Sequence, residues 1–330
     1  MRDQHLQFRQ LHQPLSRLLL ILLLAGLVGG CASSRISLDD AGLPSAAELT
    51  EVPFYPQEAY QCGPAALATM LAQRGVPADP DVLVDQVYIP GRRGSLQVEM
   101  VAAARAAGLL VYPLRSRLED VLAEVAAGNP VLVLQNLAFD RWPQWHFAVV
   151  VGYDLVEQRL VLRSGTTERW IASFRDFERT WSKAERWAVV TLNPDQLPAT
   201  ARETVWLRSA SDLEEVGQVR PARVAYEAAV ARWKSSLGLF ALANSQYAAG
   251  QKEMAERSLR DSIATDPGFA IGWFNLSHVL AERGCHVGAQ QARSCAKRLA
   301  PDDPRFDAPL PAVTRESAAS CQPAPPCGAR

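Results

Sequence analysis

The sequence predicts an α+β domain followed by an all-helical domain of repeated helix pairs. Helical patterns precede runs of β-branched residues between positions 52 and 194. After position 195 the pattern becomes almost purely helical and repeats with a period near 34 residues. A chain of 330 residues with 48% hydrophobic content is long enough to bury two cores.

The N-terminus has the features of a signal peptide. Arg2, Arg9 and Arg17 precede an apolar run from Leu18 to Val28. This run is well short of the roughly 20 residues that a bilayer-spanning helix needs. We therefore assign residues 1–30 to a signal peptide.

The end of this signal resembles the lipobox of bacterial lipoproteins. Gly29 and Gly30 stand directly before Cys31, the residue whose thiol takes the diacylglycerol in that family. The resemblance implies a lipid anchor on Cys31, and the lack of Asp directly after it implies an outer membrane lipoprotein that faces the periplasm. An ordinary cleaved signal with an incidental cysteine is the alternative.

Residues 31–50 contain few large apolar residues and are expected to form a tether between the lipidated cysteine and the first domain. The first domain is expected to span residues 51–195. Helices are predicted over 63–74 and 96–107, the second with Ser95 as a candidate N-cap. Strands are predicted over 130–135, 146–152, 159–163 and 187–192.

Residues 200–303 contain three units of similar pattern. Gly250 and Pro267 in the second unit correspond to Gly284 and Pro301 in the third, each offset by 34 positions, and a weaker first unit contains Gly217. These positions resemble the tetratricopeptide repeat. The resemblance implies a solenoid that binds a protein partner, and a generic bundle of helical hairpins is the alternative.

The remaining residues, 304–330, are rich in proline and are predicted to be disordered. Four cysteines lie in the repeats and this tail, at positions 285, 295, 321 and 327. An even number suits two disulfides in an oxidising compartment, with three connectivities open for Cys285, Cys295, Cys321 and Cys327. A zinc site is disfavoured because no CxxC pair is present.

The charge balance excludes one class of partner. The formal charge is −1 for the chain and −3 for residues 31–330, and no basic stripe is present. Nucleic acid is therefore not an expected partner.

Cys62 is the candidate nucleophile, since it stands where a helix is predicted to begin. The amides and dipole of a helix N-terminus, together with a nearby imidazolium, lower the pKa of a thiol from its ordinary value. Gln57 could donate its side-chain amide to the oxygen that becomes negative during attack on a carbonyl, with Gln61 as a substitute.

His146 is the candidate base. His5 and His12 lie in the signal peptide, and His278 and His286 lie in the repeats. His146 opens an apolar strand, where neighbouring loops can leave a cleft. The aromatic residues between positions 139 and 145 are expected either to line this cleft or to cap the sheet.

Together, Gln57, the segment Cys62-Gly63-Pro64-Ala65-Ala66 and the strand from His146 to Tyr153 resemble the bacteriocin-processing, double-glycine cysteine peptidases. The resemblance implies a papain-like fold and cleavage of a peptide or protein substrate through an acyl-enzyme, with no metal or other cofactor. It also implies that Gln57 stabilises the oxyanion, Cys62 attacks and His146 acts as base.

The sequence departs from this family at the third catalytic position. The family has an Asp on the strand after the histidine strand, where this chain has Leu162-Arg163-Ser164-Gly165. Ser164 and Asp154 are the candidates for orienting His146, although Asp154 suits a turn better. Two hypotheses follow: a cysteine peptidase with a partner-binding repeat domain, or a degenerate peptidase-like scaffold that binds proteins through its repeats.

Overall fold

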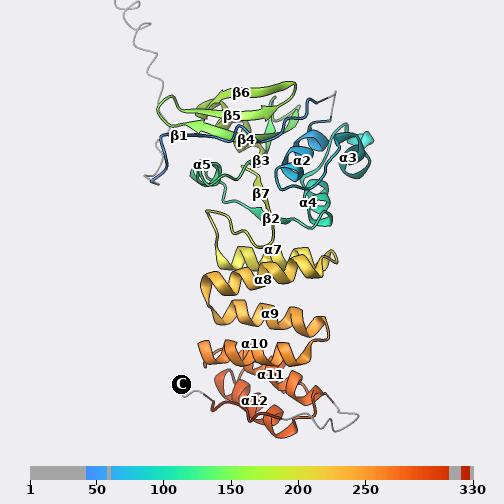
Figure 1. Ribbon diagram of the computed structural model, residues 1–330, viewed down its shortest axis with the longest axis vertical. Helices are drawn as coiled ribbons and strands as arrows, with labels where there is room; N and C mark the ends of the chain where they lie inside the picture. Colours follow the sequence, from blue (N-terminus) through green and yellow to red (C-terminus); the bar gives the residue numbers. More distant parts are fainter. Residues whose placement is uncertain (1–41, 58–60, 312–320, 328–330) are drawn as a thin grey trace, which may run out of the picture. The chain divides into compact units, whose positions relative to one another are not determined.

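The computed structural model describes residues 42–57, 61–311 and 321–327 (Figure 1). The predicted signal peptide and the lipidation site Cys31 lie outside the described residues. Within the described residues, no helix combines the length and apolar character needed to cross a bilayer.

The first part of the chain is built on one antiparallel sheet of seven strands. Six of them follow the order β2-β7-β3-β4-β5-β6, and β1 pairs with β4. The strands are β1 (Ala46–Glu48), β2 (Leu110–Pro113), β3 (Val131–Asn136), β4 (Trp145–Asp154), β5 (Arg159–Ser164), β6 (Thr167–Ser173) and β7 (Ala188–Leu192). Since β1 belongs to the sheet, the folded domain includes residues 46–48, which the sequence had assigned to the tether.

Among the described residues, five α-helices accompany the sheet: α2 (Cys62–Ala72), α3 (Pro80–Val87), α4 (Gln97–Ala106), α5 (Leu118–Ala126) and α6 (Phe174–Trp181). Helix α2 packs against β4, where Leu67 and Met70 share a buried core with Phe147 and Val149. The alternation of side chains along β4 directs these apolar residues to the α2 face. The predicted α+β arrangement is confirmed.

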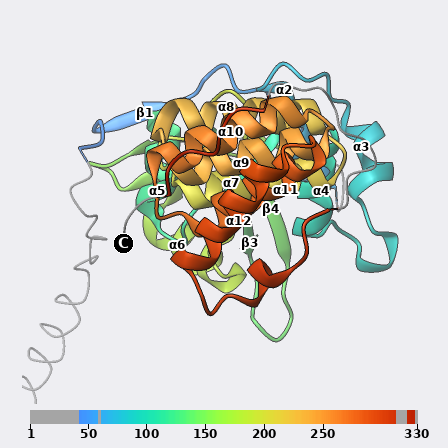
Figure 2. The ribbon, with the colours of Figure 1, turned by 90° about the horizontal axis from the view of Figure 1, so that it is seen from below.

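Six further helices follow the sheet as three antiparallel pairs, within the part of the chain that the structure describes (Figures 1 and 2). They are α7 (Glu203–Glu215), α8 (Val219–Trp233), α9 (Ser236–Ala248), α10 (Lys252–Thr265), α11 (Ala270–Glu282) and α12 (His286–Leu299). Gly217, Gly250 and Gly284 end the first helix of each pair with φ of 85°, 75° and 82°, a conformation that glycine adopts without strain. The predicted all-helical region is therefore present.

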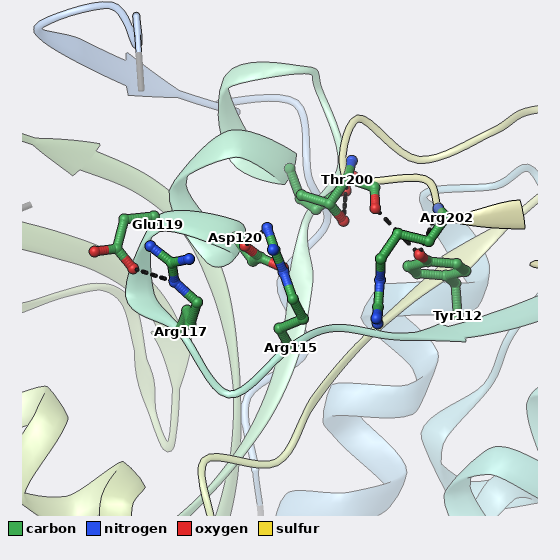
Figure 3. A network of polar contacts seen from close by, with 8 residues as sticks. Tyr112, Arg115, Arg117, Glu119, Asp120, Thr200 and Arg202 are labelled. Atoms are coloured by element: carbon green, nitrogen blue, oxygen red, sulfur yellow. Dashed lines mark hydrogen bonds and ion pairs between the residues drawn. The ribbon is translucent and has the colours of Figure 1, made fainter. Parts of the chain in front are cut away.

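A buried polar network joins the sheet to the first helix pair. The Glu124 carboxylate is fully buried and accepts hydrogen bonds from Thr200 N at 2.7 Å, Thr200 Oγ1 at 2.6 Å and Asn129 Nδ2 at 2.8 Å. Tyr112 adds a second connection, because its hydroxyl donates to Thr200 O and accepts from Arg202 N (Figure 3). These bonds fix the path of the chain into α7.

The C-terminal tail differs from its predicted disorder wherever the structure describes it. Residues Pro304–Asp307 form a short 3₁₀ helix (η3) whose Phe306 is buried. Two disulfides, Cys285–Cys321 and Cys295–Cys327, attach residues 321–327 to the last helix pair. Arg260 also donates to the carbonyls of Gln322 and Pro323. The two disulfides and the Arg260 hydrogen bonds thus hold this proline-rich segment against the helices.

Candidate active site

Cys62 is the first residue of α2, and Gln61 is its N-cap. Pro64 occupies the first turn, where its missing N–H costs no helical hydrogen bond. The residues from Gly63 to Leu71 are all buried, so α2 is held in the core and its first turn has a fixed position. Cys62 is partly buried and is the free cysteine of the described residues.

Gly63 allows a close approach behind the nucleophile. A Cβ at this position would lie 2.2 Å from Ser95 Oγ and 2.5 Å from Ser95 Cβ. Ser95, predicted to cap the following helix, does not do so: the N-cap of α4 is Leu96, with no side-chain cap bond. The Ser95 hydroxyl is instead buried against the start of α2 with no hydrogen-bond partner. The sequence alone does not reveal this contact, because it joins two segments about 30 positions apart.

Gly63→Ala is expected to destabilise the protein by about 1–3 kcal/mol, the usual cost of overpacking a tight site. Alanine has the better helix propensity, by about 1 kcal/mol, so any loss in urea unfolding reports the clash with Ser95. The double variant Gly63→Ala, Ser95→Gly removes both clashing atoms and is expected to recover the lost stability. A single Gly63→Ala variant as stable as the parent chain would contradict the close approach.

His146 stands near the start of β4, opposite Gln135 of β3. Its Nε2 lies 2.8 Å from Ser164 Oγ. The β4–β5 pairing is in register at Arg163, and the β5–β6 register shifts between Leu162 and Ser164, at the end of the strand. The structure thus brings His146 and Ser164 together.

Asp154, the other candidate for orienting His146, lies at the opposite end of β4. Its carboxylate accepts a hydrogen bond from Glu157 N at 2.9 Å, within the turn that leads to β5. A strand rises about 3.4 Å per residue, so the eight positions between the two residues amount to roughly 27 Å. Of the two candidates, only Ser164 lies within reach of the imidazole.

The Cys62 thiol reaches the same strand. The backbone amides of Phe147, the residue after His146, and of Gly63 lie near the thiol and lower its pKa. Burial has the larger effect, however, and raises the pKa of the Cys62 thiol. Burial likewise lowers the pKa of His146.

These two shifts favour the neutral forms of the Cys62 thiol and the His146 imidazole. The sequence led us to expect a lowered thiol pKa from the helix N-terminus and an imidazolium. The difference arises because a tightly packed helix start removes Cys62 from water, and desolvation opposes the charged form of both groups.

The pH dependence of Cys62 alkylation checks this assignment. Iodoacetamide reacts with the thiolate, so the rate rises through the thiol pKa. We expect the midpoint for Cys62 in the folded protein to lie above the ordinary value of about 8.5. The urea-unfolded chain serves as the control and should return to that value. A folded-state midpoint below about 7 would indicate a thiolate–imidazolium pair and contradict the neutral one.

The backbone of Gln57 lies beside the end of β5 that carries Ser164. Its backbone N–H donates to Gly165 O at 3.1 Å, so it lies next to the residue that follows Ser164. Gln61 directly precedes the nucleophile. Gln57 and Ser164 thus occupy neighbouring segments, although they lie far apart in the sequence.

A cavity of about 390 Å³ adjoins this cluster on the face of the sheet that α6 covers. His146 and Ser164 line it, together with Gln135, Leu162, Trp170 and Phe177. Gln135 is buried and donates to Thr180 Oγ1 at 2.7 Å, which joins β3 to α6. Among the described residues, no cluster of histidine, cysteine or acidic side chains has the arrangement of a metal site.

Residues 49–189 match the model of a family described as the Peptidase_C39 like family. No curated protein matches the chain.

One similar solved structure is a double glycine motif protease from an AMS/PCAT transporter in complex with the leader peptide. It is 20% identical, covers 44% of this chain and 92% of its own, and has a TM-score of 0.33. Another is the peptidase domain of Streptococcus ComA, a bi-functional ABC transporter involved in a quorum sensing pathway. It is 17% identical, covers 43% of this chain and 98% of its own, and has a TM-score of 0.36.

Proposed function

We propose that this protein, whose residues 49–189 form a C39-like peptidase domain, is a cysteine peptidase that cleaves peptide bonds with Cys62 as nucleophile and His146 as base. The observation that carries the proposal is the position of the Cys62 thiol. It lies near the backbone amide of Phe147, which lowers its pKa, while the adjacent residue His146 is hydrogen-bonded to Ser164. Nucleophile, base and orienting group are thus drawn from α2, β4 and β5.

The proposed reaction begins from the neutral pair. An imidazole that donates from Nε2 to Ser164 leaves Nδ1 free to accept the thiol proton as sulfur attacks the carbonyl carbon. The backbone N–H of Cys62 and the side-chain amide of Gln57 stabilise the oxyanion. The C–N bond then breaks, His146 returns the proton to the leaving amine, and water hydrolyses the thioester.

We extend the proposal to the helical region as a tetratricopeptide-like solenoid that binds a protein partner or the substrate itself. The period of the helix pairs and the buried Ala222, Ala255 and Ala289 support this reading. A cavity of about 190 Å³ between α9 and α11 offers Asn244 and Asn275 as polar groups. Asn275 donates to Asn244 at 2.8 Å, and the remaining donors and acceptors of the two amides suit the backbone of an extended peptide.

A catalytically degenerate scaffold is the second candidate function, favoured by the uncharged Ser164 in the third position. A neutral hydrogen bond stabilises an imidazolium less than a carboxylate does. In this second proposal, the helical region performs the function by binding a partner, and Cys62 and His146 no longer catalyse a reaction.

We further propose that lipid on Cys31 anchors the protein to the outer membrane, facing the periplasm. The two disulfides support an oxidising compartment. Membrane fractionation of the parent chain and Cys31→Ala tests this proposal, since loss of the acyl chains should release the protein to the soluble fraction.

The peptidase proposal is tested with a mixture of peptides of random sequence, incubated with the full chain or with Cys62→Ala. Mass spectrometry then identifies new termini. Cleavage that depends on Cys62 supports the peptidase, and identical peptide profiles for both proteins favour the scaffold.

A further inference from the structure

The residues that line the cavity beside His146 indicate which part of a bound peptide it receives. His146 and Ser164 line it, whereas Cys62 does not. Helix α2 packs on one face of the sheet and α6 lies across the cavity on the other face. The cavity therefore extends from the imidazole away from the helix that carries the nucleophile.

This position distinguishes the two sides of a bound peptide. In acyl transfer, the base that takes the proton from the nucleophile returns it to the leaving amine, so the leaving amine must lie at the imidazole. The carbonyl carbon lies at the sulfur. A peptide that crosses from Cys62 to His146 therefore continues into the cavity with the residues that follow the scissile bond.

The walls of the cavity indicate which side chain it takes. Leu162 and Phe177 are buried and apolar, and Leu137 and Trp170 stay 46% and 53% exposed although they are large and apolar. Exposed apolar side chains around a concavity are typical of a binding site. The polar members include Gln135 and Thr180, which bond each other, and Asp176 and Arg179, which form an exposed ion pair.

We infer that this cavity binds the side chain that directly follows the scissile bond and selects a large apolar or aromatic one. A volume of about 390 Å³ accommodates such a side chain together with the backbone that carries it. Trp170 forms one wall and stacks on the incoming residue. The inference rests on the proposed peptidase function and adds its substrate preference.

The loop between β3 and β4 carries further exposed apolar side chains beyond Leu137. Phe139 and Trp142 are 77% and 70% exposed, and they pair across the loop that leads from Leu137. Neither residue lines the cavity, and their exposure shows that they do not cap the sheet, so neither of the two roles expected from the sequence is observed for them. The residues further along the leaving segment would meet this surface.

The test uses the full chain, purified in detergent, and peptides that share one cleaved sequence and differ only after the scissile bond. Relative kcat/KM is measured for Phe, Leu, Ala and Asp at that position. We expect Phe and Leu to exceed Ala and Asp by about tenfold or more, the range that a few apolar contacts supply.

Trp170→Ala is the informative variant, because its side chain is half exposed and its loss leaves the core intact. It should reduce the Phe-to-Ala ratio of kcat/KM severalfold. Ile171→Ala is the matched control, since Ile171 is the next residue of β6 and lies on the opposite face, outside the cavity. A second variant, Ala172→Phe, fills the cavity and should favour small residues after the cut.

The outcomes separate the two proposals. Cleavage that depends on Cys62 but shows no preference after the cut, or a preference that Trp170→Ala leaves intact, overturns the inference while the peptidase stands. An absence of Cys62-dependent cleavage in all peptides overturns the peptidase and, with it, this assignment of the cavity.

Discussion

If the protein is the proposed peptidase, Cys62→Ala is expected to abolish peptide cleavage, with a loss of at least about 10⁴-fold, because the proposed thioester forms on the Cys62 sulfur. His146→Ala should lower kcat/KM by about 10²–10⁴-fold, the usual contribution of a positioned base. The two residues act in one step, so the double variant should be no worse than Cys62→Ala alone. The measurement is kcat/KM on one peptide that the parent chain cleaves.

Ser164 occupies the position of the group that orients His146, and the strength of its hydrogen bond limits the effect of removing it. A neutral hydrogen bond contributes about 0.5–1.5 kcal/mol, so Ser164→Ala should cost about 2- to 10-fold in rate. Replacing the charged Asp of a Ser-His-Asp triad, by contrast, costs about 10⁴-fold. Asp154→Asn is the control and should leave kcat/KM unchanged, since Asp154 bonds its own turn, far from the imidazole. A larger loss for Asp154→Asn than for Ser164→Ala would contradict the assignment.

Glu124→Ala is expected to lower the free energy of unfolding by about 3–5 kcal/mol, because its carboxylate is fully buried and accepts from Thr200, Ala199 and Asn129. Truncation leaves these donors buried and unpaired, and each costs about 1–3 kcal/mol. Urea unfolding measures the loss, and hydrogen exchange of the Thr200 amide locates it at the junction before α7.

Glu119→Ala is the matched control on the same helix. Glu119 pairs with Arg117 at 3.4 Å at the protein surface (Figure 3). Such surface pairs contribute about 0–1 kcal/mol, so this variant should unfold nearly as the parent chain does. Equal losses for Glu119→Ala and Glu124→Ala would show that the network does not hold the junction.

The main elements of the fold could be predicted from local patterns. The strands now seen as β3, β4, β5 and β7 begin and end within about two residues of their predicted limits, because buried strands give continuous apolar runs. β6 was missed because its exposed residues, Thr167 to Ile171, give no such run. Helix α6 was also missed, although Phe174, Phe177 and Trp181 recur at helical spacing after the N-cap Ser173 and could have indicated it.

The residues of the site were easier to predict from the sequence than the contacts between them. Cys62 and His146 could be nominated from a helix start and a strand start. The bond between His146 and Ser164 depends on how β5 ends, and the contact of Gly63 with Ser95 depends on how the chain returns to α2. Neither leaves a local pattern. The pKa of Cys62 was mispredicted for the same reason, since burial is a property of the assembled core.

The raised pKa of Cys62 also affects how the chain acquires its disulfides. Thiol–disulfide exchange proceeds through the thiolate, so a thiol with a raised pKa exchanges slowly. Four cysteines of the helical region and its tail pair with one another, while Cys62 keeps its thiol in the folded domain. Burial of Cys62 thus opposes its exchange with the four cysteines that form the two bridges.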